Sequence, residues 1–141
     1  MIKLGIVVAE YNRDITSKME KAAESEAKKL KCIVKRKFYV HGVLDVPLAA
    51  DYLLRQKNID AVVVVGAILQ GETHHDIVVA DVATRGISQV VLKYGKPVGW
   101  GISGPRQTKQ QAEKRADDYS RQAVRAAVQI KQQMRPSSQL R

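Results

Sequence analysis

The stretch Ile59-Asp-Ala-Val-Val-Val-Val65 decides our interpretation of the fold. Its four consecutive valines, without polar alternation, predict a strand that is buried on both faces, as in the centre of a parallel sheet. A loop containing Gly66 and Gly71 follows, and residues 76–94 then show the apolar spacing of a helix. A buried strand followed by a helix is the building unit of parallel sheets, so this stretch indicates an α/β protein.

The segments on both sides of this unit repeat the strand-then-helix pattern. Asn12 and Asp14, which are good helix N-caps, precede apolar residues at helical spacing. Such alternation predicts a parallel sheet with right-handed crossovers and helices on both faces. The predicted elements are a strand over 2–9, a helix over 15–30, a strand over 33–40, a helix over 47–57, a strand over 59–65, a helix over 76–94, a strand over 97–102 and a helix from Thr108.

The spacing also predicts which side chains face inward. Residues 33–40 alternate between apolar and polar types, so we place Val34, Phe38 and Val40 on one face of a strand at the sheet edge, with the other face in water. Two helices have a predicted inward face. It comprises Leu48, Tyr52 and Leu53 in the helix that starts at Pro47, and Ala112, Tyr119, Ala123, Ala126, Ala127 and Ile130 in the last helix.

The composition is that of a folded protein. The chain has 141 residues, and this length predicts one domain, which we place at residues 1–134 with a polar tail over 135–141. The only cysteine, Cys32, excludes an internal disulfide framework and a multi-cysteine metal cage. No apolar run approaches the ~20 residues of a membrane span. The first residues lack a signal-peptide cleavage site, so we expect a soluble, cytoplasmic protein without a membrane partner.

The net charge of +10 raises the hypothesis of nucleic-acid binding. The basic excess falls on residues 1–40 and 105–141, whereas residues 41–104 carry 5 basic and 6 acidic side chains. No zinc-finger spacing, aromatic RNA-binding signature or Gly-Arg repeat accompanies it. We therefore interpret the excess as solvated surface and do not expect a nucleic-acid partner.

Ligands in open parallel sheets bind outside the carboxyl ends of the strands, which directs attention to four loops. In the loop over 66–75, Gly71 permits a tight turn, and the Thr73 hydroxyl lies beside N–H groups at a helix start, an arrangement suited to a phosphate. His74 and His75 titrate near neutral pH and can move protons. Thr73 is equally typical of an ordinary helix N-cap, and the two histidines are equally typical of solvated surface.

The other loops offer aromatic and charged groups. Tyr11 and Trp100, which we place at strand ends, either sandwich a flat heterocycle or cap the apolar core. Asp45 either accepts hydrogen bonds from a ligand or caps the helix ahead of Pro47. Arg115, in the last helix, either donates to a phosphate or lies on the surface.

Taken together, four segments resemble the lumazine synthase family, most closely its archaeal branch. The most specific is the Gly-Glu-Thr-x-His signature at residues 71–75, and the likeness extends over residues 2–134. The segments are Gly5-Ile-Val-Val-Ala-Glu-Tyr-Asn12, Val40-His-Gly-Val-Leu-Asp-Val-Pro47, Gly66-Ala-Ile-Leu-Gln-Gly-Glu-Thr-His-His75 and Trp100-Gly-Ile-Ser-Gly-Pro105.

This resemblance implies a flavodoxin-like three-layer sandwich with a four-stranded parallel sheet. It also implies a reaction of riboflavin biosynthesis: 5-amino-6-(D-ribitylamino)uracil condenses with 3,4-dihydroxy-2-butanone 4-phosphate to 6,7-dimethyl-8-ribityllumazine, with release of phosphate and water. No metal and no redox cofactor are implied.

Roles for individual residues follow from the same resemblance. His75 would be the catalytic residue that transfers protons, and Trp100 would come from the neighbouring subunit's side of the site. The implied substrate contacts are Tyr11, Val43, Leu44, Asp45, Ala67, Ile68, Leu69 and Trp100, and the implied phosphate contacts are Glu72, Thr73 and Arg115.

The family assembles as pentamers, often as a shell of twelve pentamers, so we expect a homo-oligomer that is at least a pentamer. Three residues depart from the family pattern. His41 stands where proline is usual, Leu44 replaces a frequent phenylalanine, and Gln70 stands where a charged residue is common.

Three alternatives stay open at this stage. The nearest is the archaeal-type riboflavin synthase, a paralogue of similar fold, although the Gly-Glu-Thr-x-His loop favours lumazine synthase. The second is a nucleic-acid-binding protein on the same scaffold. The third is a degenerate member that keeps the assembly but has lost activity, which His41 and Leu44 suggest.

Overall fold

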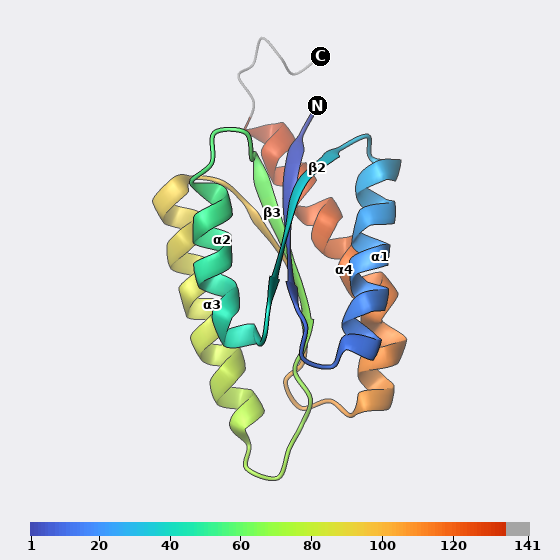
Figure 1. Cartoon of the computed structure of the whole chain (residues 1–141). Coiled ribbons are helices and arrows are strands. Elements are labelled where there is room, and N and C mark those ends of the chain that lie inside the picture. Colours follow the sequence, from blue (N-terminus) through green and yellow to red (C-terminus); the bar gives the residue numbers. More distant parts are fainter. Residues whose placement is uncertain (135–141) are drawn as a thin grey trace.

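The structure, a computed structural model, describes residues 1–134, in which four strands alternate with helices as predicted (Figure 1). The predicted tail over 135–141 lies outside the described residues. The elements are β1 (Lys3–Ala9), α1 (Arg13–Lys29), β2 (Ile33–Val40), the 3₁₀ turn η1 (Val43–Asp45), α2 (Val46–Leu54), β3 (Ala61–Ala67), α3 (His75–Tyr94), β4 (Val98–Ser103) and α4 (Lys109–Gln133).

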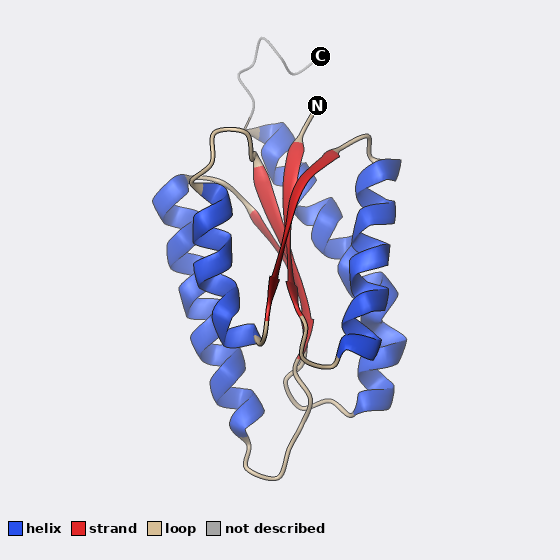
Figure 2. Cartoon of the chain, in the orientation of Figure 1, coloured by secondary structure: helices blue, strands red, loops and turns tan. Residues whose placement is uncertain are grey.

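The four strands form one parallel sheet in the order β2-β1-β3-β4. Helices α1 and α4 cover one face and α2 and α3 the other, which makes three layers (Figure 2). The predicted α/β sandwich is therefore confirmed. All seven residues of β3 are buried, as the valine run predicted. In the part of the chain that the structure describes, no helix has the length and apolar character needed to cross a membrane.

Alternating residues of the central strands divide the core into two layers. Leu4, Ile6 and Val8 of β1 face α1 and α4, whereas Val7 and Ala9 face α2 and α3. In β4, glycine faces α4, and a Cβ built on Gly99 would lie 2.0 Å from the carbonyl oxygen of Ala123. Helix α4 thus packs directly on strand backbone, so its buried stripe is made mainly of small residues.

Strand β2 lies at the sheet edge, as predicted, but its predicted faces are wrong at Val34. The register with β1 shifts between Leu4, which pairs with Val34, and Gly5, which pairs with Arg36, so Lys35 is the extra residue of a β-bulge. Because the bulge reverses the alternation, Val34 packs towards α1 while Phe38 packs towards α2. The polar face is also not simply wet, since Lys37 and Tyr39 contact α1.

Two helix faces differ from prediction as well. In α2 the buried stripe is Val46, Ala49, Ala50, Leu53 and Leu54, and Leu48 is 75% exposed. Residues 48 and 52 have helical spacing too, so the apolar pattern alone does not select between the two stripes. In α4 the close approach to β4 favours small residues. Tyr119, Ala126 and Ile130 are therefore exposed, and the buried positions are Ala112, Ala116, Ser120, Ala123, Val124, Ala127 and Val128.

A buried carboxylate joins α1 to α4. The Glu26 side chain is 2% exposed and accepts hydrogen bonds from Arg125 (Nε, 2.9 Å) and Arg121 (Nη1, 3.2 Å). The hydrogen bond from Arg125 contributes most to lowering the pKa of Glu26, and burial, which opposes ionisation, does not cancel it. Ionised Glu26 therefore stabilises the folded chain above the ordinary glutamate pKa, and this stabilisation is lost as the pH falls through the lowered pKa.

We expect Glu26→Gln to lower the free energy of unfolding by about 1–3 kcal/mol at pH 7, because charge-assisted hydrogen bonds are lost. The difference from wild type should shrink as the pH falls from the ordinary glutamate pKa to the lowered pKa of folded Glu26, because the unfolded wild type takes up the proton first. Urea unfolding between pH 3 and 7 measures both effects. Asp81→Asn, which breaks the exposed pair with Arg85, is the control and should change little. A pH-independent deficit in Glu26→Gln would contradict this role.

Candidate active site

A pocket of about 640 Å³ opens at the carboxyl ends of the strands, where the topology predicted a site. It is walled by the loops that follow β1, β2 and β3 and by the first turn of α3. Its volume lies in the range of small-molecule sites. The lining residues are Tyr11, Asn12, His41, Gly42, Val43, Leu44, Asp45, Ala67, Ile68, Leu69, Gln70, Gly71, His75, Asp76 and Val79.

Tyr11 and His41 form one side of the pocket. Their rings meet edge to face, with centroids 6.0 Å apart and planes at 65°. The N–H of Tyr11 donates to the carbonyl oxygen of His41 at 2.9 Å, which extends the pairing of β1 and β2 beyond the strands. Tyr11 is 65% exposed, so it does not cap the core and its ring is available for stacking.

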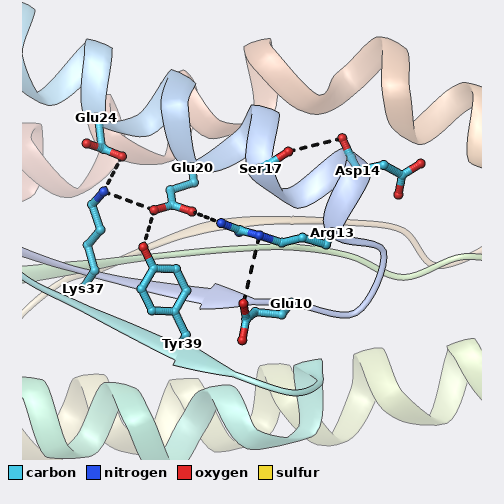
Figure 3. Close-up of polar contacts among 8 residues, drawn as sticks. All are labelled: Glu10, Arg13, Asp14, Ser17, Glu20, Glu24, Lys37 and Tyr39. Carbon is cyan, nitrogen blue, oxygen red and sulfur yellow. Dashed lines mark hydrogen bonds and ion pairs between the residues drawn. The ribbon is translucent and has the colours of Figure 1, made fainter.

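A buried charge network holds this side of the pocket in place (Figure 3). Glu20 of α1 accepts hydrogen bonds from Arg13 (2.9 Å), from Lys37 of β2 (3.1 Å) and from the Tyr39 hydroxyl. Burial tends to raise the pKa of Glu20, but the hydrogen bonds from Tyr39, Arg13 and Lys37 outweigh it and the pKa is lowered. Because the network ties the start of α1 to β2, it fixes the turn that carries Tyr11.

Asn12 connects this turn to the central strand. It stands at the N-cap position of α1, as predicted, but its side chain makes no cap hydrogen bond. Instead its amide donates to the carbonyl oxygen of Ala67 at 3.3 Å, at the end of β3. Asn12 has φ 67°, a left-handed conformation that asparagine tolerates better than most residues.

The segment after β3 lines the pocket, and both main-chain polar groups of Ile68 in this segment form hydrogen bonds. The N–H of Ile68 donates to the carbonyl oxygen of Ser103 at 2.8 Å, and its carbonyl oxygen accepts from the Gln107 amide at 3.3 Å. The N–H of Gln70 donates to the carbonyl oxygen of Gln107 at 2.9 Å. Hydrogen bonds to the end of β4 and to the loop between β4 and α4 therefore hold this wall of the pocket in place.

His75 is the first residue of α3 and lines the pocket. The N-cap is His74, with φ 57° and no side-chain cap bond, so the interpretation of Thr73 as the N-cap is wrong. Asp76, which follows, is buried. One of its carboxylate oxygens accepts from the N–H of Arg106 at 2.9 Å, and the other has no hydrogen-bond partner in residues 1–134.

Four of the predicted site residues lie outside the pocket of this chain. Trp100 is the third residue of β4 and pairs with Val64, so it does not stand at the strand end where we placed it. It is partly buried against the α2 and α3 layer. Glu72 and Thr73 are exposed on the loop before α3, and Arg115 is exposed on α4. Within one chain, therefore, Tyr11 and Trp100 do not enclose a common ligand.

Our sequence analysis did not name Asn12, Asp76 or Val79 as site residues. The sequence indicated only that Asn12 caps a helix. It does stand at the N-cap position, but its side chain donates to the carbonyl oxygen of Ala67 instead. Asp76 is a polar residue one position after His75; it is buried, and its hydrogen-bond partner Arg106 lies thirty residues away in the chain. No group of three His, Cys, Asp or Glu side chains that could hold a metal ion occurs among the described residues.

Known proteins resemble this chain over most of its length. The family model described as 6,7-dimethyl-8-ribityllumazine synthase matches residues 1–135. A protein of that name from Methanocaldococcus jannaschii is 50% identical over 130 residues, which cover 92% of each chain. The relative of the same name from Methanococcus maripaludis is 48% identical over 92% of this chain and 94% of its own. The one from Metallosphaera sedula is 47% identical over 95% of this chain and 89% of its own.

We expect Asn12→Ala to destabilise the fold more than Asn12→Gly. Both variants lose the hydrogen bond to Ala67, at a cost of about 1 kcal/mol. Alanine also pays roughly 1–2 kcal/mol for the left-handed conformation, which glycine adopts freely. Urea unfolding at pH 7 measures the difference. Equal losses in the two variants would show that the backbone conformation of Asn12 is not a source of strain.

Proposed function

Because the chain belongs to the 6,7-dimethyl-8-ribityllumazine synthase family, we propose that it catalyses the reaction that gives the family its name. It condenses 5-amino-6-(D-ribitylamino)uracil with 3,4-dihydroxy-2-butanone 4-phosphate and releases phosphate and water. The observation that supports this proposal is that the family match spans residues 1–135, which include every wall of the pocket. A cytoplasmic location stays a prediction of the sequence.

The pocket provides the chemistry that the flat pyrimidine needs. Tyr11 offers an aromatic face at the rim, and Val43, Leu44 and Ile68 offer apolar walls. Asp45 lines the same pocket, and one of its carboxylate oxygens accepts from the N–H of Gly42 at 3.2 Å. This contact holds the carboxylate at the pocket wall, where its other oxygen serves as an acceptor for pyrimidine or ribityl donors.

His75 is the residue that we propose moves protons. The primary amine of the pyrimidine adds to the butanone ketone, and water leaves as the imine forms. A proton is then removed from carbon while the phosphate departs, and the resulting enol becomes a ketone. The ribitylamino nitrogen adds to this ketone, and a second loss of water completes the ring. Each step moves protons at neutral pH, which is the range in which imidazole serves both as acid and as base.

Glu72, Thr73 and Arg115 are proposed to receive the phosphate. Arg115 donates one hydrogen bond, to Gln107, and forms no ion pair within residues 1–134, so its positive charge is available to an anion. Glu72 and Thr73 are exposed on the loop that leads to His75. Thr73 can donate from its hydroxyl, and we propose that Glu72 contributes through its main-chain N–H, because its carboxylate would repel a phosphate.

We further propose that the chain functions as a ring of five copies, with the shell of twelve pentamers as its extension. Trp100 lies outside the pocket of its own chain, so we propose that it acts in the site of a neighbouring copy. The α2 and α3 layer exposes apolar side chains that a second copy would bury. They are Leu48, Val78, Val82 and Leu92, each at least half exposed.

An assay of the fluorescent lumazine product tests the reaction. The wild type should accelerate product formation over the same mixture without protein, because the condensation also proceeds slowly unaided. His75→Ala should lower kcat by about 10²-fold or more with a smaller effect on KM. His74→Asn, which keeps a residue that tolerates the left-handed conformation, is the matched control and should retain activity.

Two results would contradict these assignments separately. Failure of the wild type to exceed the protein-free mixture would refute the proposed reaction. Full activity in His75→Ala, with an active wild type, would refute only the role of His75.

Sedimentation of the wild type should give a mass of at least five chains of 15.7 kDa. Val82→Asp should dissociate the assembly, because it would place a charge in a buried contact. Leu30→Asp, at the C-cap of α1 in the opposite layer, should leave the ring of five intact. A monomeric wild type, or a Val82→Asp variant that assembles as the wild type does, would refute the proposed contact surface.

A further inference from the structure

The side chain of Gln107 lies fully buried between the pocket wall and α4. Its amide oxygen accepts a hydrogen bond from Arg115 Nη1 at 3.0 Å. Its amide nitrogen donates to the carbonyl oxygen of Ile68 at 3.3 Å and to the hydroxyl of Ser103 at 2.8 Å. Gln107 and Ser103 are both 0% exposed, so these contacts are made away from water.

The partners determine the orientation of this amide. A guanidinium can only donate and a backbone carbonyl can only accept, so the oxygen of Gln107 must face Arg115 and its nitrogen must face Ile68. The reverse orientation would place two donors together at one end and two acceptors together at the other. Neither glutamate nor methionine can make both contacts.

Arg115 is held by a neutral group, which leaves its charge uncompensated. The single hydrogen bond to Gln107 engages one of its five N–H donors. By contrast, Arg121 and Arg125 on the same helix both form ion pairs with Glu26. In residues 1–134 no carboxylate lies within ion-pair distance of Arg115. A guanidinium that is held in place but not neutralised is suited to binding an anion.

The backbone around Gln107 ties the same segment to the pocket. The carbonyl oxygen of Gln107 accepts from the N–H of Gln70 at 2.9 Å, and the N–H of Arg106 donates to Asp76 at 2.9 Å. The donor Gln70 and the acceptor Asp76 both line the pocket. The segment over 103–107 therefore connects Arg115 to the loop before α3 and to the first turn of α3, which begins with His75.

We propose that Gln107 is a positioning residue that sets the place of the Arg115 guanidinium for a phosphate. It does so through one amide that is anchored on the Ile68 carbonyl. Identifying that phosphate with the butanone phosphate rests on the proposed function. The role requires both ends of the amide, because the Ile68 end locates the side chain and the Arg115 end holds the guanidinium without neutralising it.

Steady-state kinetics of three variants test this role. Gln107→Met removes both contacts, and Gln107→Glu places a carboxylate against Arg115 that neutralises it. Both should raise KM for the butanone phosphate by on the order of tenfold, the value of one charge-assisted hydrogen bond, and should raise KM for the pyrimidine less. Gln122→Met makes the same substitution at an exposed glutamine of α4, whose amide donates to Asp118. As the matched control, it should leave KM for both substrates unchanged.

A double-mutant cycle separates positioning from general destabilisation. If Gln107 acts through Arg115, then Gln107→Met should add little to the KM for butanone phosphate when Arg115 is already methionine. Additive effects of the two substitutions, or equal rises in KM for the two substrates, would overturn the proposal.

Binding of inorganic phosphate, measured calorimetrically on the wild-type protein and the variants, gives a readout independent of turnover. Arg115→Met and Gln107→Met should each weaken binding by on the order of tenfold, and the control Gln122→Met should not. If the wild type made no lumazine but bound phosphate with this dependence, the proposed function would fail and the positioning role would stand. Phosphate binding that is unchanged in Gln107→Met would overturn the positioning role whatever the turnover.

Discussion

The burial of β3 on both faces is the constraint on which the remaining structure depends. A strand without water on either side must obtain its backbone hydrogen bonds from neighbouring strands, and its side chains need cover on both faces. Parallel neighbours satisfy the first demand, and helices in the connections satisfy the second. Because all strands then run the same way, their carboxyl ends meet at one edge, where no helix covers them. The pocket occupies that edge.

At this edge the ladder of hydrogen bonds between strands ends, and side chains and loop main-chain groups supply the remaining hydrogen bonds. The carbonyl oxygen of Ala67 is satisfied by the side chain of Asn12, and Ile68 is satisfied by Ser103 and Gln107. The buried carboxylate of Glu20 plays a similar part between α1 and β2. These polar contacts join loops that are distant in the sequence, so the walls of the pocket are fixed by specific donors and acceptors more than by apolar packing.

The order and approximate bounds of the elements could be predicted from the sequence, because they depend on the local periodicity of apolar residues. The errors occur where tertiary context selects between equivalent patterns. Leu48 lies on an apolar stripe that happens to face outward, and Tyr119 is displaced by the close packing of α4 on β4. For the pocket, topology correctly located the loops after β1, β2 and β3, whereas the predicted fourth segment, residues 100–105, does not line it. The contacts of Asp76 and Gln107 could not be foreseen, since each depends on a partner thirty or more residues away.

The bulge at Lys35 has a consequence for how this edge of the sheet tolerates change during evolution. The bulge absorbs one residue in a strand that, within residues 1–134, pairs only with β1, so the insertion disturbs no second ladder there. A homologue lacking that residue would form a straight strand in which Arg36, Phe38 and Val40 still face α2 and Lys37 and Tyr39 still face α1. The edge strand can thus gain or lose a single residue while His41 and the pocket stay where they are. In β3, paired on both sides, the same change would reverse the packing of two layers at once.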